Sequence, residues 1–196
     1  MRLYYVRHGL TDWNAAGRLQ GQLDVPLNQI GREQAARCGG ILRDLFERDG
    51  WPDPTSEYVS SPLARARTTM ETMRGVLGLP AAGYRLEPRL AEISFGEWEG
   101  LTYREITQRE PNVTARREAD KWRFSPPGGE SYEQLAQRVG AWLVTVEHEA
   151  VVCAHGGTGR ALVALLGVAP PDEAVHHSID QGVVYLFERG RVTRYE

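Results

Sequence analysis

The sequence predicts an α/β fold, a three-layer α/β/α sandwich in which helices cover both faces of a mostly parallel central sheet. Short apolar runs at residues 3–6, 58–60 and 150–154 alternate with longer segments in which apolar residues recur at helical spacing. Such alternation favours parallel strand pairing. Each run ends in polar residues, and in open α/β sheets ligands bind beyond the carboxyl ends of the strands. We therefore expect a site at these strand ends.

Length and composition restrict the class of protein. With 196 residues, a single domain covering residues 1–196 is expected. The net charge of −3 argues against a nucleic-acid-binding protein, so any anion must be held by a local cluster of cations. No apolar run approaches the ~20 residues that span a bilayer, so no membrane partner is expected. Cys38 and Cys153 form neither a disulfide framework nor a metal-ligand pattern, which fits a cytoplasmic protein.

The first strand ends at Arg7, His8 and Gly9. This combination suits an anionic substrate, because a guanidinium group offers a planar fork of donors and an imidazole can attack or carry a proton. Gly9 is expected to let the backbone approach a bound group closely. The loop at residues 11–27 follows, and its polar positions are expected to fold back around the same anion: Thr11, Asn14, Arg18 and Gln20, with Gly21 beside them.

The next elements lead to a second strand end. Asn28 is expected to cap a helix over about residues 30–48 that ends at Gly50, and residues 51–57 form a Pro-rich connection. After the strand at 58–60, Ser61 is expected to be the N-cap of a helix that extends to about residue 77. Arg65 then lies near the positive end of the helix dipole and extends the anion site.

Residues 87–130 contain a candidate acid and a candidate lid. Glu92 precedes an apolar stretch, so partial burial is expected to raise its pKa and make it a proton donor, whereas Glu97 and Glu99 are expected to be solvated. Thr102 and Glu105 form the capping box of a short helix. The region at about 101–130 is expected to be a lid. Within it, residues 111–129 are expected to be irregular in structure and rich in basic side chains, and the alternative is that these side chains form an ordinary solvated surface. The basic residues are Arg116, Arg117, Lys121 and Arg123.

The last third of the sequence predicts the third strand end. A capping box at Ser131 starts an amphipathic helix to about residue 149, and the apolar strand at 150–154 ends at His155 and Gly156. Thr158 is expected to cap a helix over residues 159–166, which places His155 against a helix N-terminus. Two strands at 183–187 and 192–195 form a hairpin at a sheet edge.

The motifs at these strand ends, in this order, resemble those of the histidine phosphatase superfamily, in its phosphoglycerate mutase-like branch. The resemblance rests on Arg7-His8-Gly9, on residues 61–68 (SPLARART), on residues 92–100 (EISFGEWEG) and on His155-Gly156. It implies a phosphoglycerate mutase-like fold and a nucleophilic His8 that becomes phosphorylated. It further implies that Glu92 is the acid that protonates the leaving oxygen and then activates water. The phosphoryl group or substrate is expected to contact Arg7, Asn14, Gln20, Gly21, Arg65, His155 and Gly156.

The expected activity is the hydrolysis of a small phosphomonoester without metal or other cofactor, because two arginines and a second histidine offset the charge on the transferred group. A phosphomutase and a non-catalytic phosphate-binding module on the same fold are alternatives, and a homodimer stays open. A cysteine phosphatase is disfavoured, because the six residues between Cys153 and Arg160 exceed that family's loop by one. Leu10 and Gln181 depart from the family pattern and bear on substrate preference.

Overall fold

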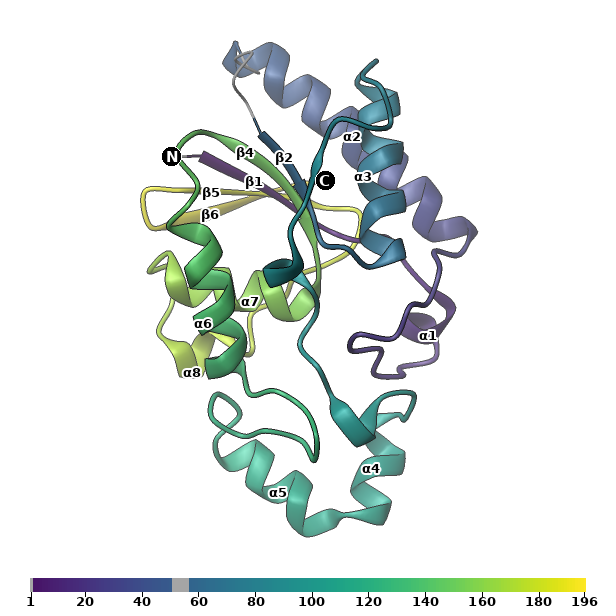
Figure 1. The fold of residues 1–196 in the computed structure, drawn as a ribbon, viewed down its shortest axis with the longest axis vertical. Helices are drawn as coiled ribbons and strands as arrows, with labels where there is room; N and C mark the ends of the chain where they lie inside the picture. The colour runs from purple at the N-terminus through teal and green to yellow at the C-terminus, as the bar shows by residue number, and fades with distance from the viewer. Residues whose placement is uncertain (1, 51–56) are drawn as a thin grey trace.

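A six-stranded sheet forms the centre of the molecule in the computed structural model, which describes residues 2–50 and 57–196 (Figure 1). Most of the Pro-rich connection expected at 51–57 lies outside the described residues. The strand order is β3-β2-β4-β1-β5-β6. The strands β3, β2, β4 and β1 are parallel, and β5 runs antiparallel to both of its neighbours. Their bounds are β1 Arg2–Arg7, β2 Glu57–Ser60, β3 Arg85–Leu86, β4 Ala150–Ala154, β5 Val184–Glu188 and β6 Arg191–Tyr195. The predicted mostly parallel sheet and its terminal hairpin are confirmed.

Helices cover both faces of the sheet, because successive side chains of a strand point to opposite faces. Tyr4 and Val6 of β1 pack with α2 (Gln29–Asp49) and α3 (Ala64–Val76). Leu3 and Tyr5 pack on the other face with α6 (Tyr132–Leu143) and α7 (Gly156–Leu165), beside which lies α8 (Pro171–Ala174). The three predicted layers are therefore present. Among the described residues no helix is long and apolar enough to cross a membrane.

Several helix boundaries follow the predicted caps. The Asn28 side chain accepts a hydrogen bond from the Gly31 amide at 2.9 Å, and Gly50 ends α2 in the left-handed conformation (φ 69°). The capping boxes of Thr102 and Ser131 start α4 (Tyr103–Arg109) and α6, respectively. These local signals are sufficient where a side chain and the backbone donor it caps are three residues apart.

Three predicted boundaries are wrong. The N-cap of α3 is Leu63 and not Ser61, and α7 begins at Gly156 with His155 as its N-cap instead of Thr158. The Thr158 hydroxyl donates to the carbonyl of Leu90 at 3.4 Å, so a tertiary contact replaces the predicted cap. Helix α6 ends at Leu143, before residue 149, and the Thr145 hydroxyl bonds to the Trp142 carbonyl beyond its end.

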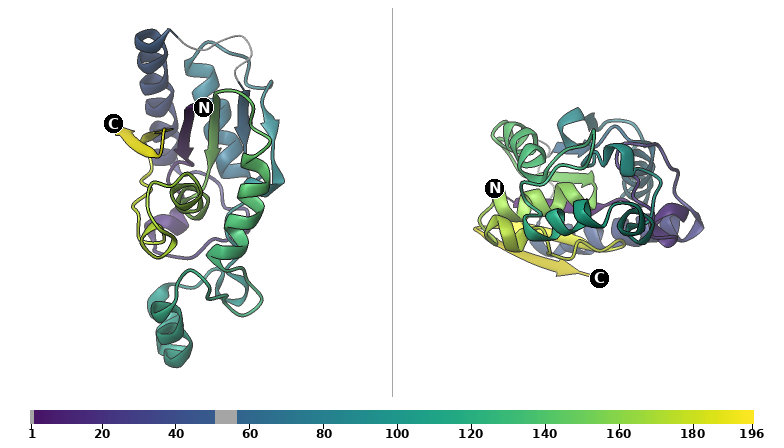
Figure 2. Two further views of the ribbon diagram at one scale, coloured as in Figure 1. Left: turned by 90° about the vertical axis from the view of Figure 1, so that its left-hand side faces the viewer. Right: turned by 90° about the horizontal axis from the view of Figure 1, so that it is seen from below.

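The segment at 111–129 is not irregular throughout, because α5 (Pro111–Ala119) follows α4 directly. Pro111 occupies the first turn, where its fixed φ and missing amide are tolerated, and alanines and arginines follow. Both helices extend beyond one end of the sheet (Figure 2). Stacked ring pairs attach the chain after α5 to the body: Trp98 on Phe124 and Trp122 on Tyr132. The shorter helices are α1 (Asp12–Ala15), η1 (Pro88–Leu90) and η2 (Gly96–Trp98).

Candidate active site

A cavity of about 160 Å³ lies at the carboxyl end of β1 and the N-terminus of α7. It gathers residues that are distant in the sequence, from the first strand to α7. Those expected from the sequence are Arg7, His8, Asn14, Gln20, Gly21, Arg65, Glu92 and Gly156. Arg18, also expected to fold back around the anion, lines the cavity too. Leu19, Phe95 and Arg160 line it without having been expected there.

His8 is fixed as a neutral imidazole with one free ring nitrogen. Its backbone amide donates to the Ala154 carbonyl of β4 at 2.9 Å, and Nδ1 lies 2.8 Å from the Gly9 carbonyl. Because a carbonyl oxygen can only accept, Nδ1 carries the proton and Nε2 keeps its lone pair. Burial, followed by the charges of Arg65 and Arg7, lowers the pKa of His8 well below 6.5. The ring is 2% exposed and neutral, and Nε2 is the ring nitrogen whose lone pair is available.

Gly9 is required by packing, in addition to the expected close approach to a bound group. A Cβ atom at Gly9 would collide with the backbone of Gly31 in the first turn of α2. The Gly9 amide also donates to Thr69 Oγ1 of α3 at 3.1 Å. The glycine therefore lets α2 pack directly against the strand end that carries His8.

Two arginines flank His8, the buried Arg65 and the partly buried Arg7, and the Glu92 carboxylate acts on both. Arg7 donates to the Ile179 carbonyl at 2.9 Å, and Arg65 donates to the carbonyls of Gly21 and Leu23 at 2.7 Å. Burial lowers the pKa of both groups. Their Nε atoms are buried without hydrogen-bond partners, and neither side chain forms an ion pair within the described part of the chain. Such donors are costly to bury unless an anion binds them.

Gly21 contributes to the site through Arg65, whose guanidinium its carbonyl orients. Its φ of 51° favours glycine, and a Cβ there would collide with the Glu99 carboxylate. Glu99 is not simply solvated as expected, because it accepts hydrogen bonds from the amides of Gln22 at 3.2 Å and Phe95 at 3.1 Å. The Glu99 carboxylate thus connects the loop that precedes α2, whose carbonyls bind Arg65, to the loop that follows Glu92.

His155 packs against His8, with ring centroids 5.1 Å apart. Its Nε2 lies 2.7 Å from Ser61 Oγ, while Nδ1 is buried without a hydrogen-bond partner among the described residues. Tyr5 donates its hydroxyl to the His155 carbonyl at 2.5 Å, which fixes the backbone at the start of α7. Burial and the charges of Arg65, His8 and Arg7 lower the pKa of His155 well below 6.5, so the ring is neutral. Ser61, predicted as a helix cap, therefore belongs to the surroundings of this histidine.

Glu92 is held at the N-terminus of α7. Its Oε1 accepts hydrogen bonds from the amides of Ile93 at 2.9 Å and Gly157 at 3.0 Å, and Oε2 has a longer 3.2 Å contact with the same Gly157 amide. Arg138 donates to the Glu92 carbonyl at 3.0 Å, which fixes the backbone as well. With Oε1 engaged by two amides, Oε2 is the oxygen that can carry a proton toward the cavity.

Asn14 and Gln20 complete the loop side of the cavity. Gln181 donates to Asn14 Oδ1 at 2.9 Å, and Thr11 bonds to the same oxygen, which leaves the amide hydrogens of Asn14 as its donors for a ligand. Gln181, noted as a departure from the family pattern, thus orients a cavity residue. Gln20 is buried, and its Oε1 has no hydrogen-bond partner in the part of the chain that the structure describes.

Arg160 is the charged cavity residue that motif analysis missed. It lies four residues after Gly156 and therefore on the same face of α7. Its Nε donates to the His177 carbonyl at 3.0 Å, and its Nη1 donates to the Tyr132 hydroxyl at 3.3 Å. The spacing of four residues between Gly156 and Arg160 could have indicated that Arg160 faces the site. That inference requires a helix that already begins at Gly156, whereas the sequence predicted a start at residue 159.

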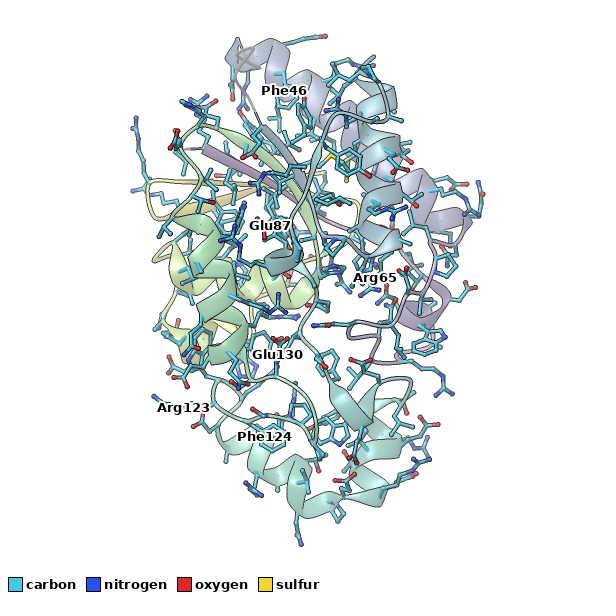
Figure 3. The ribbon with its side chains drawn as sticks, in the orientation of Figure 1. Phe46, Arg65, Glu87, Arg123, Phe124 and Glu130 are labelled. Atoms are coloured by element: carbon cyan, nitrogen blue, oxygen red, sulfur yellow. The ribbon has the colours of Figure 1, made fainter. Side chains whose placement is uncertain are left out.

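The four basic residues of the expected lid do not act as one surface, and the described cavity lining includes none of them. Arg123 is 70% exposed, pairs with Asp120 and lies at the outer edge of the molecule, whereas Arg65 lies toward its centre (Figure 3). Arg116 is exposed, and Arg117 lies over the Tyr103 ring. Lys121 is half-buried, and burial, Arg117 and Arg160 lower its pKa to about 8.

Comparison with known proteins agrees with this geometry. Residues 3–194 match the histidine phosphatase superfamily (branch 1). A glucosyl-3-phosphoglycerate phosphatase of Mycobacterium tuberculosis is 37% identical over 179 residues, 84% of this chain and 74% of that protein. The 2,3-bisphosphoglycerate-dependent phosphoglycerate mutase 2 of Gloeobacter violaceus is 31% identical over 197 residues, 95% of this chain and 84% of the mutase. The crystal structure of the alpha-ribazole phosphatase from Shigella flexneri superposes with a TM-score of 0.79 at 26% identity, covering 98% of this chain and 94% of that one. The chain therefore belongs to the histidine phosphatase superfamily, branch 1.

Proposed function

We propose that the protein hydrolyses small phosphomonoesters through a phosphohistidine formed on His8. The observation that carries this proposal is the buried, neutral His8 with Nε2 unprotonated, next to Arg7 and Arg65. The two guanidinium groups match the roughly two negative charges of a phosphoryl group. The phosphatases among its relatives support the same reaction class.

The reaction has two displacements. His8 Nε2 attacks phosphorus, the ester P–O bond breaks, and Glu92 Oε2 donates its proton to the leaving oxygen. Glu92 then takes a proton from water, which attacks the phosphohistidine and breaks the N–P bond. His8 returns to its neutral form with Nδ1 still bonded to the Gly9 carbonyl. Arg7, Arg65, Asn14 and His155 offset or orient the charge of the phosphoryl group in both steps.

The proposal predicts a covalent adduct on one residue. Rapid acid-free quenching with a ³²P-labelled phosphomonoester should trap an acid-labile, alkali-stable label that maps to His8. The His8→Asn variant should lose the adduct and nearly all turnover, while Cys153→Ser, which changes a buried thiol of the strand, should retain both. Full turnover by His8→Asn, or a label on another residue, contradicts the proposal.

A phosphomutase is the second candidate, favoured by the similarity to a phosphoglycerate mutase. The two activities share the phosphohistidine and differ in the acceptor. The same labelled enzyme, mixed with 2-phosphoglycerate or 3-phosphoglycerate, should release inorganic phosphate if it is a hydrolase. Transfer of most of the label to the added phosphoglycerate instead identifies a mutase.

A further inference from the structure

Four cations in or beside the cavity, Arg7, Arg65, Arg160 and Lys121, lack within the described chain the ion-pair partners that Arg18, another cavity residue, and Arg138 have. Arg18 pairs with Glu105 at 3.2 Å and Arg138 pairs with Glu130 at 2.9 Å. In the described residues, by contrast, no ion pair within 4.0 Å involves Arg7, Arg65, Arg160 or Lys121. Burial lowers the pKa of Arg7, Arg65 and Lys121, whereas the burial of Arg160 is outweighed by Tyr132 and Glu92, which raise its pKa. An anionic ligand would stabilise the charged form of all four groups.

Arg160 faces Arg7 across Gly156. A Cβ atom at Gly156 would lie 3.5 Å from Arg160 Nη1 and 3.5 Å from Arg7 Cζ. Both guanidinium groups line the cavity, and the Arg160 group is held there by the Tyr132 hydroxyl and the His177 carbonyl. Two fixed cations are therefore adjacent, although Arg7 already serves the phosphoryl position beside His8.

Lys121 continues the positive charge beyond Arg160. Trp122, its neighbour in the chain, stacks on Tyr132 with ring centroids 6.4 Å apart, and the hydroxyl of Tyr132 contacts Arg160. Burial and the cations Arg117 and Arg160 lower the pKa of Lys121 to about 8. Through Trp122 and Tyr132, the chain at Lys121 is therefore packed against the residue that holds the Arg160 guanidinium.

The charge in this region exceeds what one phosphoryl group needs. Arg7 and Arg65 compensate a phosphoryl dianion. The Glu92 carboxylate acts on Arg160 and that of Glu118 on Lys121, but neither carboxylate lies within ion-pair distance of these two cations. Arg160 and Lys121 remain. We propose that Arg160 and Lys121 bind a second anionic group, on the part of the substrate that does not react. This inference rests on the proposed function, and it makes both residues determinants of specificity and not catalytic residues.

Three phosphomonoesters on one three-carbon frame test the inference: glycerol 3-phosphate with an uncharged end, 3-phosphoglycerate with a carboxylate, and glycerol 1,3-bisphosphate with a second phosphoryl group. The wild-type protein should favour at least one of the charged compounds in kcat/KM. Arg160→Gln and Lys121→Gln should each lower kcat/KM for that compound by about 10- to 100-fold, mainly through KM. In Lys121→Gln the kcat/KM for glycerol 3-phosphate should change by less than about 3-fold. In Arg160→Gln, which alters the cavity beside Arg7, the loss of kcat/KM on glycerol 3-phosphate should be smaller than the loss on the charged compound. Which charged compound is affected identifies the group.

Arg123→Gln is the matched control, because it removes an exposed cation of the same segment that pairs with Asp120. It should leave all three substrates unchanged. The inference is overturned if kcat/KM falls equally for all three compounds in both test variants. It is also overturned if kcat/KM for the charged compound falls in neither variant. If Arg160→Gln does not fold, Lys121→Gln decides alone, since Lys121 is half-buried and forms no ion pair within 4.0 Å among the described residues.

A pH series adds a second measurement. Lys121 is faced by Arg117 and Glu118 of α5 and by Arg160 of α7. As Lys121 loses its proton above about pH 8, the KM for the charged substrate should rise in the wild-type protein and not in Lys121→Gln. An identical rise in both proteins contradicts the role of Lys121. Failure of the proposed function is distinguishable, because it would abolish hydrolysis of glycerol 3-phosphate and labelling of His8 as well.

Discussion

His155 is oriented by one buried hydroxyl group, that of Ser61 at 2.7 Å from Nε2. Removing it in Ser61→Ala leaves a buried imidazole with both ring nitrogens unpartnered, since Nδ1 has no partner either. Losing a partner of a buried polar group costs about 1–3 kcal/mol, so kcat should fall by about 10-fold or more. Steady-state kinetics on one phosphomonoester, with kcat and KM measured separately across pH, checks this.

Ser60→Ala provides the control for loss of a buried serine. Ser60 precedes Ser61, is equally buried, and donates its hydroxyl to the Ser61 carbonyl at 3.0 Å instead of to a histidine. It should keep kcat, and Ser61→Cys should recover part of the loss and of the pH profile. If Ser60→Ala and Ser61→Ala lose activity to the same extent, the effect is structural and not a positioning role.

At the scale of elements, the first turn of α7 determines where Glu92 lies. A Cβ atom at Gly157 would collide with Glu92 Oε1, although alanine favours a helix over glycine by up to about 1 kcal/mol. Gly157→Ala should therefore fold normally and displace the acid. Its kcat on an alkyl phosphate should fall by about 10²- to 10⁴-fold, the usual size of a lost general acid, with a smaller loss on 4-nitrophenyl phosphate.

Gly40→Ala in α2 is the matched control, because a Cβ there meets nothing within 4 Å. It should leave both rates unchanged and slightly raise stability. Glu92→Gln should reproduce the substrate dependence of Gly157→Ala. Equal losses on the alkyl and the nitrophenyl ester would mean that the first turn of α7 supports the fold of the site and not the acid.

At the scale of the whole molecule, the folded state keeps His8 and His155 neutral, and this makes stability depend on pH. Both folded pKa values are lowered well below 6.5, so below that pH the unfolded chain binds protons that the folded protein does not. The free energy of unfolding must then fall as pH falls below 6.5. Between pH 7.5 and 5.5 each histidine contributes a loss of roughly 1.4 kcal/mol. Urea unfolding in phosphate-free buffer at both pH values measures it.

The His8→Gln variant measures how much His8 alone contributes to the pH dependence of the free energy of unfolding. Between pH 7.5 and 5.5 the free energy of unfolding of His8→Gln should fall by roughly 1.4 kcal/mol less than that of the wild-type protein, because one of the two lowered pKa values is removed. Identical pH dependence in both proteins would show that His8 is not held neutral by the fold.

The sequence by itself determined the alternation of strands and helices, the caps at Asn28, Thr102 and Ser131, and the motif residues that gather at the cavity. These depend on neighbours a few positions apart, on hydrophobic periodicity or on short motifs. Only the tertiary structure decided that Gly9 packs on Gly31 and that Ser61 contacts His155, because these pairs come from separate elements. It also separated Lys121, beside Arg160, from the exposed Arg123 two residues later. The physical reason is that burial and charge compensation depend on which distant segments pack together, and local sequence does not encode that distance.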